Sequence, residues 1–123
     1  MLTTPSFLTP LESAVISAML EASTEFGAAL SVQLAESTLE SREHNGYGFY
    51  TTFHVSDGTE PIPPPVPLID RRFAASTVVG GQLCGFLLWI LNGKIDFLEG
   101  YPLGGDEWPS NESFGPITLD QST

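Results

Sequence analysis

The fold is decided by residues 83–101, which run LCGFLLWILNGKIDFLEGY. An apolar stretch over residues 83–91 is followed by Asn92-Gly93, and Asn-Gly is the dipeptide most typical of a two-residue hairpin turn. Residues 94–101 then alternate, and one face of that strand is expected to carry Ile95, Phe97, Glu99 and Tyr101. The stretch therefore predicts two antiparallel strands joined by a tight turn.

The first of these strands is apolar on both faces. Alternate side chains point to opposite sides, with Phe86, Leu88 and Ile90 on one and Leu87, Trp89 and Leu91 on the other. An antiparallel sheet with one face in water would instead alternate apolar and polar residues. Two hypotheses follow. Either the second face meets another chain, as in a homodimer through the sheet, or the Pro-rich loop and the C-terminal tail close over it.

Further strands are expected on both sides of this hairpin. Residues 37–43 and 48–55 flank the turn dipeptide Asn45-Gly46, and the second strand should place Phe49, Thr51, Phe53 and Val55 on one face and Tyr50, Thr52 and His54 on the other. Residues 72–79 form a strand that stops at Gly80-Gly81, and residues 117–119 form a short edge strand.

Helices are expected at the N-terminal end of the chain. Residues 10–22 carry apolar side chains at helical spacing, Thr9 can cap the helix, Pro10 suits its first position, and Glu12 is assigned to its polar side. Residues 24–36 fit both a helix and a strand, and their alanines favour a second helix.

This order of elements predicts an α+β fold. Two N-terminal helices pack on one face of a mainly antiparallel sheet of about five strands. The chain of 123 residues forms a single domain over residues 1–123, with loose ends at residues 1–6 and 120–123.

The composition limits the kind of partner. The chain has 15 acidic and 4 basic residues, a net charge of −11. With so few basic residues it should bind neither nucleic acid nor an anionic membrane. The charge suits a basic protein, or simply a solvated acidic surface.

The single cysteine, Cys84, cannot form a disulfide within the chain, which favours a reducing compartment. Residues 1–10 lack the basic start of a secretory signal. The longest apolar run, residues 86–91, is far shorter than the roughly 20 residues of a membrane-spanning helix. The expected location is the cytoplasm.

Glu99 is the carboxylate that could carry chemistry. It lies between Phe97 and Tyr101, where partial burial would raise its pKa and make it a candidate acid or base. The alternative, which we favour, is a structural carboxylate that pairs with Arg71 or Arg72 or accepts hydrogen bonds from backbone amides.

Other motifs for chemistry are weak. His44 and His54 could bind a metal with Glu40 or Glu43, but they match no known ligand spacing, so neither a metal nor a cofactor is expected. No nucleophile elbow is present, so no catalytic residue is assigned. The Pro-rich segment at residues 61–67 should form polyproline II, as a stiff connector rather than an SH3-type ligand.

Three segments carry a resemblance. Residues 46–53 (GYGFYTTF), 85–93 (GFLLWILNG) and 98–101 (LEGY), with Trp108-Pro109, resemble a group of small bacterial proteins with a GxGF[FY]T strand and a C-terminal LEG[YF] hairpin. The resemblance implies an N-terminal helical part and a closing hairpin, and it implies no activity. Some small acidic bacterial proteins of this kind resemble immunity proteins for secreted toxins.

These observations favour a non-enzymatic protein-interaction module, either immunity-like or self-associating. Its expected interaction surface consists of Trp89, Phe97, Tyr101 and Trp108. The alternative is a small-molecule binder or weak enzyme with a pocket between helices and sheet. The residues expected to line that pocket are Tyr50, His54 and Glu99.

Overall fold

The structure, a computed structural model, describes residues 4–63 and 71–119. Its elements in chain order are the helices α1 (Pro10–Ala22) and α2 (Gly27–Glu36) and the strands β1 (Thr38–His44), β2 (Phe49–His54), β3 (Arg71–Val79), β4 (Gln82–Leu91), β5 (Lys94–Pro102) and β6 (Thr118–Leu119). The α+β class and the N-terminal position of both helices are confirmed. The sheet has six strands rather than about five, because the short edge strand β6 pairs with β3.

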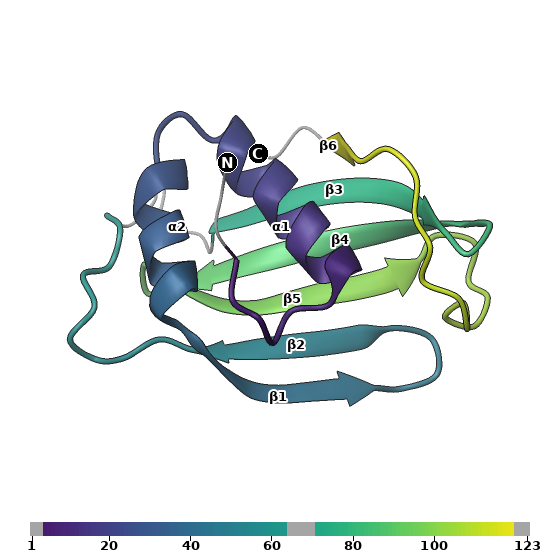
Figure 1. The fold of residues 1–123 in the computed structure, drawn as a ribbon, viewed down its shortest axis with the longest axis horizontal. Helices are drawn as coiled ribbons and strands as arrows, with labels where there is room; N and C mark the ends of the chain where they lie inside the picture. The colour runs from purple at the N-terminus through teal and green to yellow at the C-terminus, as the bar shows by residue number, and fades with distance from the viewer. Residues whose placement is uncertain (1–3, 64–70, 120–123) are drawn as a thin grey trace.

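The strands form one antiparallel sheet in the order β1-β2-β5-β4-β3-β6 (Figure 1). The chain leaves β2, crosses to β3 and returns through β4 and β5, so that β5 pairs with β2. At the β4–β5 turn Asn92 and Gly93 both have positive φ, +54° and +77°, as the predicted two-residue hairpin requires. Residues 64–70, which hold much of the expected polyproline segment, residues 1–3 of the expected loose end 1–6, and the expected loose end 120–123 lie outside the described residues.

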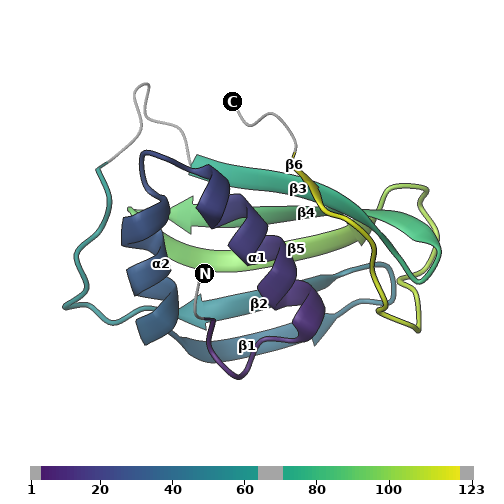
Figure 2. The same cartoon turned by 45° about the horizontal axis from the view of Figure 1, so that its top comes forward.

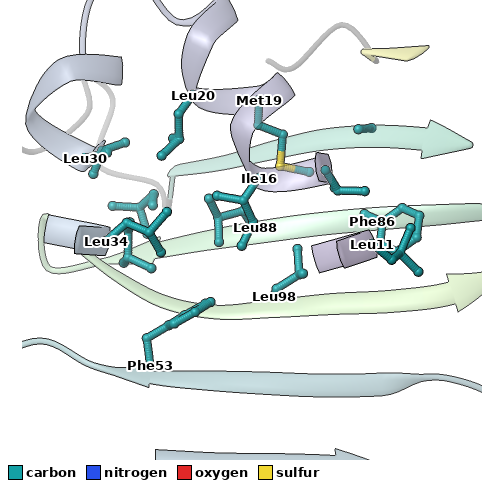
Figure 3. Packing of buried hydrophobic residues seen from close by; sticks show 14 of the residues in the cluster. Leu11, Ile16, Met19, Leu20, Leu30, Leu34, Phe53, Phe86, Leu88 and Leu98 are labelled. Atoms are coloured by element: carbon teal, nitrogen blue, oxygen red, sulfur yellow. The ribbon is translucent and has the colours of Figure 1, made fainter. Parts of the chain in front are cut away.

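Both helices cover the same face of the sheet (Figures 1 and 2). Their apolar side chains meet those of β2, β3, β4 and β5 in one continuous core, part of which Figure 3 shows: Leu11, Ile16, Met19, Leu20, Leu30, Leu34, Phe53, Phe86, Leu88 and Leu98. The predicted alternation of β2 and β4 is confirmed, since Phe49, Phe53, Leu88 and Ile90 are all buried. We call this the inner face of the sheet and the opposite one the outer face.

The start of α1 is fixed by a capping box. The Thr9 hydroxyl accepts a hydrogen bond from the Glu12 backbone N–H at 3.1 Å, and the Glu12 carboxylate accepts one from the Thr9 N–H at 2.9 Å. The predicted cap and the role of Pro10 at the first helical position are confirmed.

The assignment of Glu12 to the polar side of the helix is wrong. Glu12 is only 2% exposed, and its carboxylate accepts hydrogen bonds from the Arg42 guanidinium at 2.7 and 3.1 Å and from the Thr51 hydroxyl. Arg42 also donates to the carbonyl of Phe7 at 3.0 Å. A charge from β1 therefore compensates the buried carboxylate and joins the first turn of α1 to the sheet.

A bulge in β5 corrects another prediction. Trp89 pairs with Phe97, but Ile90 pairs with Ile95, which leaves Asp96 as an extra residue between the pairs. Ile95 therefore points into the core at 2% exposure and does not share a face with Phe97. From Phe97 onward the predicted alternation holds on the outer face.

The described parts of the C-terminal tail and the Pro-rich loop pack on the inner side of the sheet. Trp108 stands edge-on against Phe49, with ring centroids 5.0 Å apart, and the Thr77 hydroxyl donates to the carbonyls of residues 115 and 116. Ile62 belongs to the core. Within residues 4–63 and 71–119, these segments therefore do not cover the outer face, and the rest of the loop and tail lies outside the described residues.

Cys84 is a free, buried thiol whose pKa is raised by that burial. Thr4, which we placed in a loose end, shares a hydrogen bond of 2.6 Å with the Ser13 hydroxyl. Within residues 4–63 and 71–119, no helix is long and apolar enough to cross a membrane.

Candidate functional site

The outer face carries a broad apolar and aromatic surface. The strand register and alternation place these side chains on it: Tyr50, Thr52 and His54 from β2, Arg72, Ala74, Ser76 and Val78 from β3, Leu83, Leu87, Trp89 and Leu91 from β4, and Phe97, Glu99 and Tyr101 from β5. Leu83 and Val78 are about half exposed, at 52% and 48%. Both helices lie on the other side of the sheet (Figure 2).

Cross-strand pairing arranges the centre of the outer face in rows. In one row Arg72 of β3 lies beside Trp89 of β4, and Trp89 lies beside Phe97 of β5. The Trp89 and Phe97 rings stack with centroids 5.9 Å apart and planes at 23°, and the Arg72 guanidinium lies 5.4 Å from the Trp89 ring centroid. The guanidinium therefore makes a cation–π contact at one end of an aromatic stack.

Glu99 lies in the next row, between Leu87 of β4 and Tyr50 of β2. The Trp89 indole N–H donates to Glu99 Oε1 at 3.3 Å, and the Tyr50 hydroxyl donates to Oε2 at 3.5 Å. Both donors are neutral, and both contacts are longer than the roughly 2.7–2.9 Å of a charge-assisted hydrogen bond. Glu99 is half-buried, and these two long hydrogen bonds hold its carboxylate only weakly.

The interpretation of Glu99 as an ion-pair partner of Arg72 is wrong, because the Arg72 guanidinium lies over Trp89 instead. The side chain of Arg71, the other candidate, lies outside the described part of the structure. The ion pair that the described residues contain joins Arg42 to Glu12 on the inner face. Glu99 therefore makes no ion pair with the described side chains.

A hollow of about 310 Å³ opens beside Glu99. Two acids and three tyrosines are among the residues that line it: Glu99, Asp106, Tyr47, Tyr50 and Tyr101. Tyr47 belongs to the β1–β2 turn, where Asn45 Oδ1 accepts hydrogen bonds from the backbone N–H groups of residues 47 and 48 at 3.0 and 2.8 Å. Asp106 belongs to the loop after β5. Because β5 pairs with β2, residues of this loop and of the β1–β2 turn line the same hollow.

The structure brings together only part of the predicted interaction surface. Trp89, Phe97 and Tyr101 share the outer face. Trp108 does not join them, because it packs against the core residues Phe49 and Phe86 on the inner side, and its indole N–H donates to Glu112 at 3.0 Å. Nothing in its local sequence distinguishes Trp108 from a surface residue.

The pocket predicted between the helices and the sheet cannot be lined as expected. Tyr50, His54 and Glu99 all lie on the outer face, whereas the residues of β2 that face the helices are Phe49, Thr51 and Phe53. The reason is the two-residue period of the strand, which turns Tyr50 and His54 away from the helices.

The two histidines that were considered as metal ligands have different surroundings. His44 places its ring 5.6 Å from the Phe49 ring, whereas His54 is exposed on the outer face. In the described residues, no three His, Cys, Asp or Glu side chains gather closely enough to hold a metal ion.

A second hollow, of about 830 Å³, lies between α2 and residues 56–63. Three glutamates contribute to its lining, namely Glu25, Glu36 and Glu60. The buried amide of Gln33 lies there, and it is already engaged: Nε2 donates to the carbonyls of residues 60 and 93 at 3.2 and 3.0 Å, and Oε1 accepts from the Ile95 N–H at 2.9 Å. Gln33 therefore links α2, the loop and β5 by hydrogen bonds.

Comparison with known proteins finds no protein-family model, no curated protein and no solved structure that matches the chain. The outer face and its hollow are therefore the features from which function is inferred. Both combine partly exposed aromatic rings with carboxylates.

Proposed function

We propose that this chain is a non-enzymatic protein-binding module and that the outer face is its binding surface. The observation that carries the proposal is the group of Trp89, Phe97 and Leu87, from two adjacent rows, at the centre of a sheet face that neither helix covers. Large apolar patches on a protein surface commonly mark interaction sites, and tryptophan and tyrosine are enriched among the residues that dominate binding energy.

Charge favours a basic protein as the partner. The chain has a net charge of −11, and carboxylates border the aromatic row, with Glu99 beside Trp89 and Glu43 paired with Tyr50. Complementary charge accelerates association and selects among partners. A second copy of the chain carries the same net charge, so self-association through this face works against electrostatic repulsion.

The test is capture from cytoplasmic extract, the proposed location, since Cys84 has no second cysteine in the chain with which to form a disulfide. Leu87→Lys places a charge at the centre of the outer face, and Val32→Lys makes the same change of charge on exposed α2, beside the second hollow. We expect wild type and Val32→Lys to retain a protein from the extract that Leu87→Lys does not retain.

The captured protein is then purified, and its affinity for all three chains is measured by calorimetry. Binding that Leu87→Lys weakens at least about tenfold, which is roughly 1.4 kcal/mol, supports the proposal. Equal retention by wild type and Leu87→Lys, or a loss confined to Val32→Lys, overturns it.

A further inference from the structure

Glu12 of α1 and Glu99 of β5 differ in their partners. On the inner face, Glu12 accepts two hydrogen bonds from the Arg42 guanidinium. On the outer face, Glu99 accepts one from Tyr50 and one from Trp89, both neutral. A carboxylate has about four acceptor positions, so Glu99 keeps capacity for a further donor.

The surroundings of Glu99 suit a planar cation. A guanidinium can donate two parallel hydrogen bonds to a carboxylate and can stack on aromatic rings, whereas an ammonium is a compact, strongly hydrated charge. The Phe97 ring lies 5.9 Å from the Tyr50 ring and 5.9 Å from the Trp89 ring, and both Tyr50 and Trp89 donate to Glu99. The chain's own Arg72, over Trp89, shows that this face accommodates a guanidinium by stacking.

The hollow beside Glu99 supplies room and a second charge. Its volume of about 310 Å³ lies at the lower end of the range of roughly 300–1,000 Å³ found for ligand pockets, which suits one long side chain. Asp106 is a second acidic residue of its lining, and Tyr47 and Tyr101 are two of the aromatic residues there.

We infer that Glu99 and this hollow form a receptor for an arginine side chain of a basic protein partner. The inference rests on the proposed function and names the group that the outer face recognises. The guanidinium pairs with Glu99, stacks against the neighbouring rings, and extends toward Asp106.

A second copy of the chain is a poor source of this arginine. Three of the four basic residues already have partners: Arg42 binds Glu12, Arg72 stacks on Trp89, and Lys94 donates to the carbonyls of residues 56 and 57 at 3.0 and 3.4 Å. The net charge of −11 adds to the mismatch. A different, basic protein supplies the complementary charge.

The experiment uses three matched peptides, acetyl-Leu-X-Leu-amide with X as arginine, citrulline or lysine, titrated into the isotope-labelled chain and followed by NMR. The Trp89 indole N–H, which donates to Glu99, is the reporter. The Trp108 indole N–H, which donates to Glu112, is the internal control. The arginine peptide is expected to shift the Trp89 signal with an affinity about tenfold higher than the neutral citrulline peptide, and higher than the lysine peptide.

Two matched variants complete the test. Glu99→Gln is expected to weaken arginine-peptide binding at least about fivefold, and Glu112→Gln is expected to leave it unchanged. An unperturbed Trp108 signal in Glu99→Gln shows that this variant is folded.

Equal binding of the arginine and citrulline peptides overturns the inference. So does equal binding of arginine and lysine, full binding by folded Glu99→Gln, or a shift at Trp108 instead of Trp89. These outcomes leave the proposed function standing if Leu87→Lys still abolishes capture of the partner. Capture that survives Leu87→Lys overturns the proposed function whatever the peptides do.

Discussion

Glu12 and Glu99 lie on opposite faces of one sheet, and the molecule treats the two carboxylates differently. Glu12, 2% exposed, is surrounded by Arg42, Thr51 and the first turn of α1. Glu99 is half-buried and touches only neutral donors at 3.3 and 3.5 Å. The inner face has its charges matched within the chain, whereas the outer face leaves a charge for another molecule to match.

This difference separates stability from binding. A buried charge that loses its partner destabilises a fold strongly, because its desolvation is no longer compensated. A partly exposed carboxylate with weak contacts contributes little to folding, since water can still solvate it. Substitutions on the inner face should therefore change the free energy of unfolding, and those on the outer face should change association.

The largest expected contrast is between two adjacent leucines of β4. Leu88 is fully buried in the core, whereas Leu87 is half-buried on the outer face. Leu88→Ala should lower the free energy of unfolding by about 3–5 kcal/mol through lost burial and a cavity. Leu87→Ala should lower it by about 1 kcal/mol or less. Urea denaturation of both variants measures the contrast, and equal losses would show that the outer face is as fully packed as the inner one.

The next effect concerns the inner charge pair. Arg42→Met removes the cation of buried Glu12 and should cost about 2–3 kcal/mol of unfolding free energy, somewhat less than for a fully buried pair because Arg42 is 26% exposed. The double variant Glu12→Gln with Arg42→Met should recover part of this loss, since no charge is then left unpaired. Urea denaturation measures the unfolding free energy of the single and the double variant. A double variant no more stable than Arg42→Met alone would contradict the explanation.

Two glycines test how rigid each face is. A Cβ on Gly100 would lie 2.3 Å from the ring of Phe49, which is buried against Phe86 and Trp108, whereas a Cβ on Gly85 would lie 2.7 Å from the half-exposed ring of Tyr101. Gly100→Ala should cost about 2–3 kcal/mol and Gly85→Ala about 1 kcal/mol or less, because only the outer ring can move toward solvent. Thermal unfolding compares them, and a larger loss for Gly85→Ala would reverse the assignment of the rigid face.

The smallest expected effect is a gain in the free energy of unfolding. Burial and the nearby charge of Glu40 raise the pKa of Asp96, the bulge residue of β5. The folded chain therefore binds this proton more readily than the unfolded chain, so ionisation of Asp96 lowers stability as pH rises through the raised pKa. Asp96→Asn should raise the unfolding free energy at pH 7 by roughly 0.5 kcal/mol or less.

The advantage of Asp96→Asn should vanish below the ordinary value of 3.8, where wild-type Asp96 is protonated in both states. Urea denaturation at several pH values measures the difference. Asp57→Asn, in an exposed turn, is the control for the same change of charge. A variant less stable than wild type at pH 7, or a difference that persists at acid pH, would contradict the expected sign.

Much of the architecture followed from local patterns. Asn92-Gly93 placed the β4–β5 turn, Thr9 and Pro10 placed the start of α1, and alternation placed Phe49 and Phe53 on one face of β2 and Tyr50 on the other. These predictions succeed because turn geometry, helix caps and strand periodicity involve residues within a few positions of one another.

The failures share a different cause. Glu12 looked like a surface residue because its partner Arg42 is 30 positions away. Ile95 was placed on the outer face because a bulge at Asp96 has no signature in the alternation that it interrupts. Trp108 looked exposed because the loop that buries it against Phe49 follows from pairing between distant strands.

The sequence by itself determined the first helix, the hairpin and a strand with two apolar faces, because each depends on spacing along the chain. Only the tertiary structure decided which apolar face stays open. Both helices lie on one side of the sheet, where Arg42 reaches Glu12. On the other side, pairing of β5 with β2 and β4 sets Glu99 among Tyr50 and Trp89, with no cation of its own among the described residues.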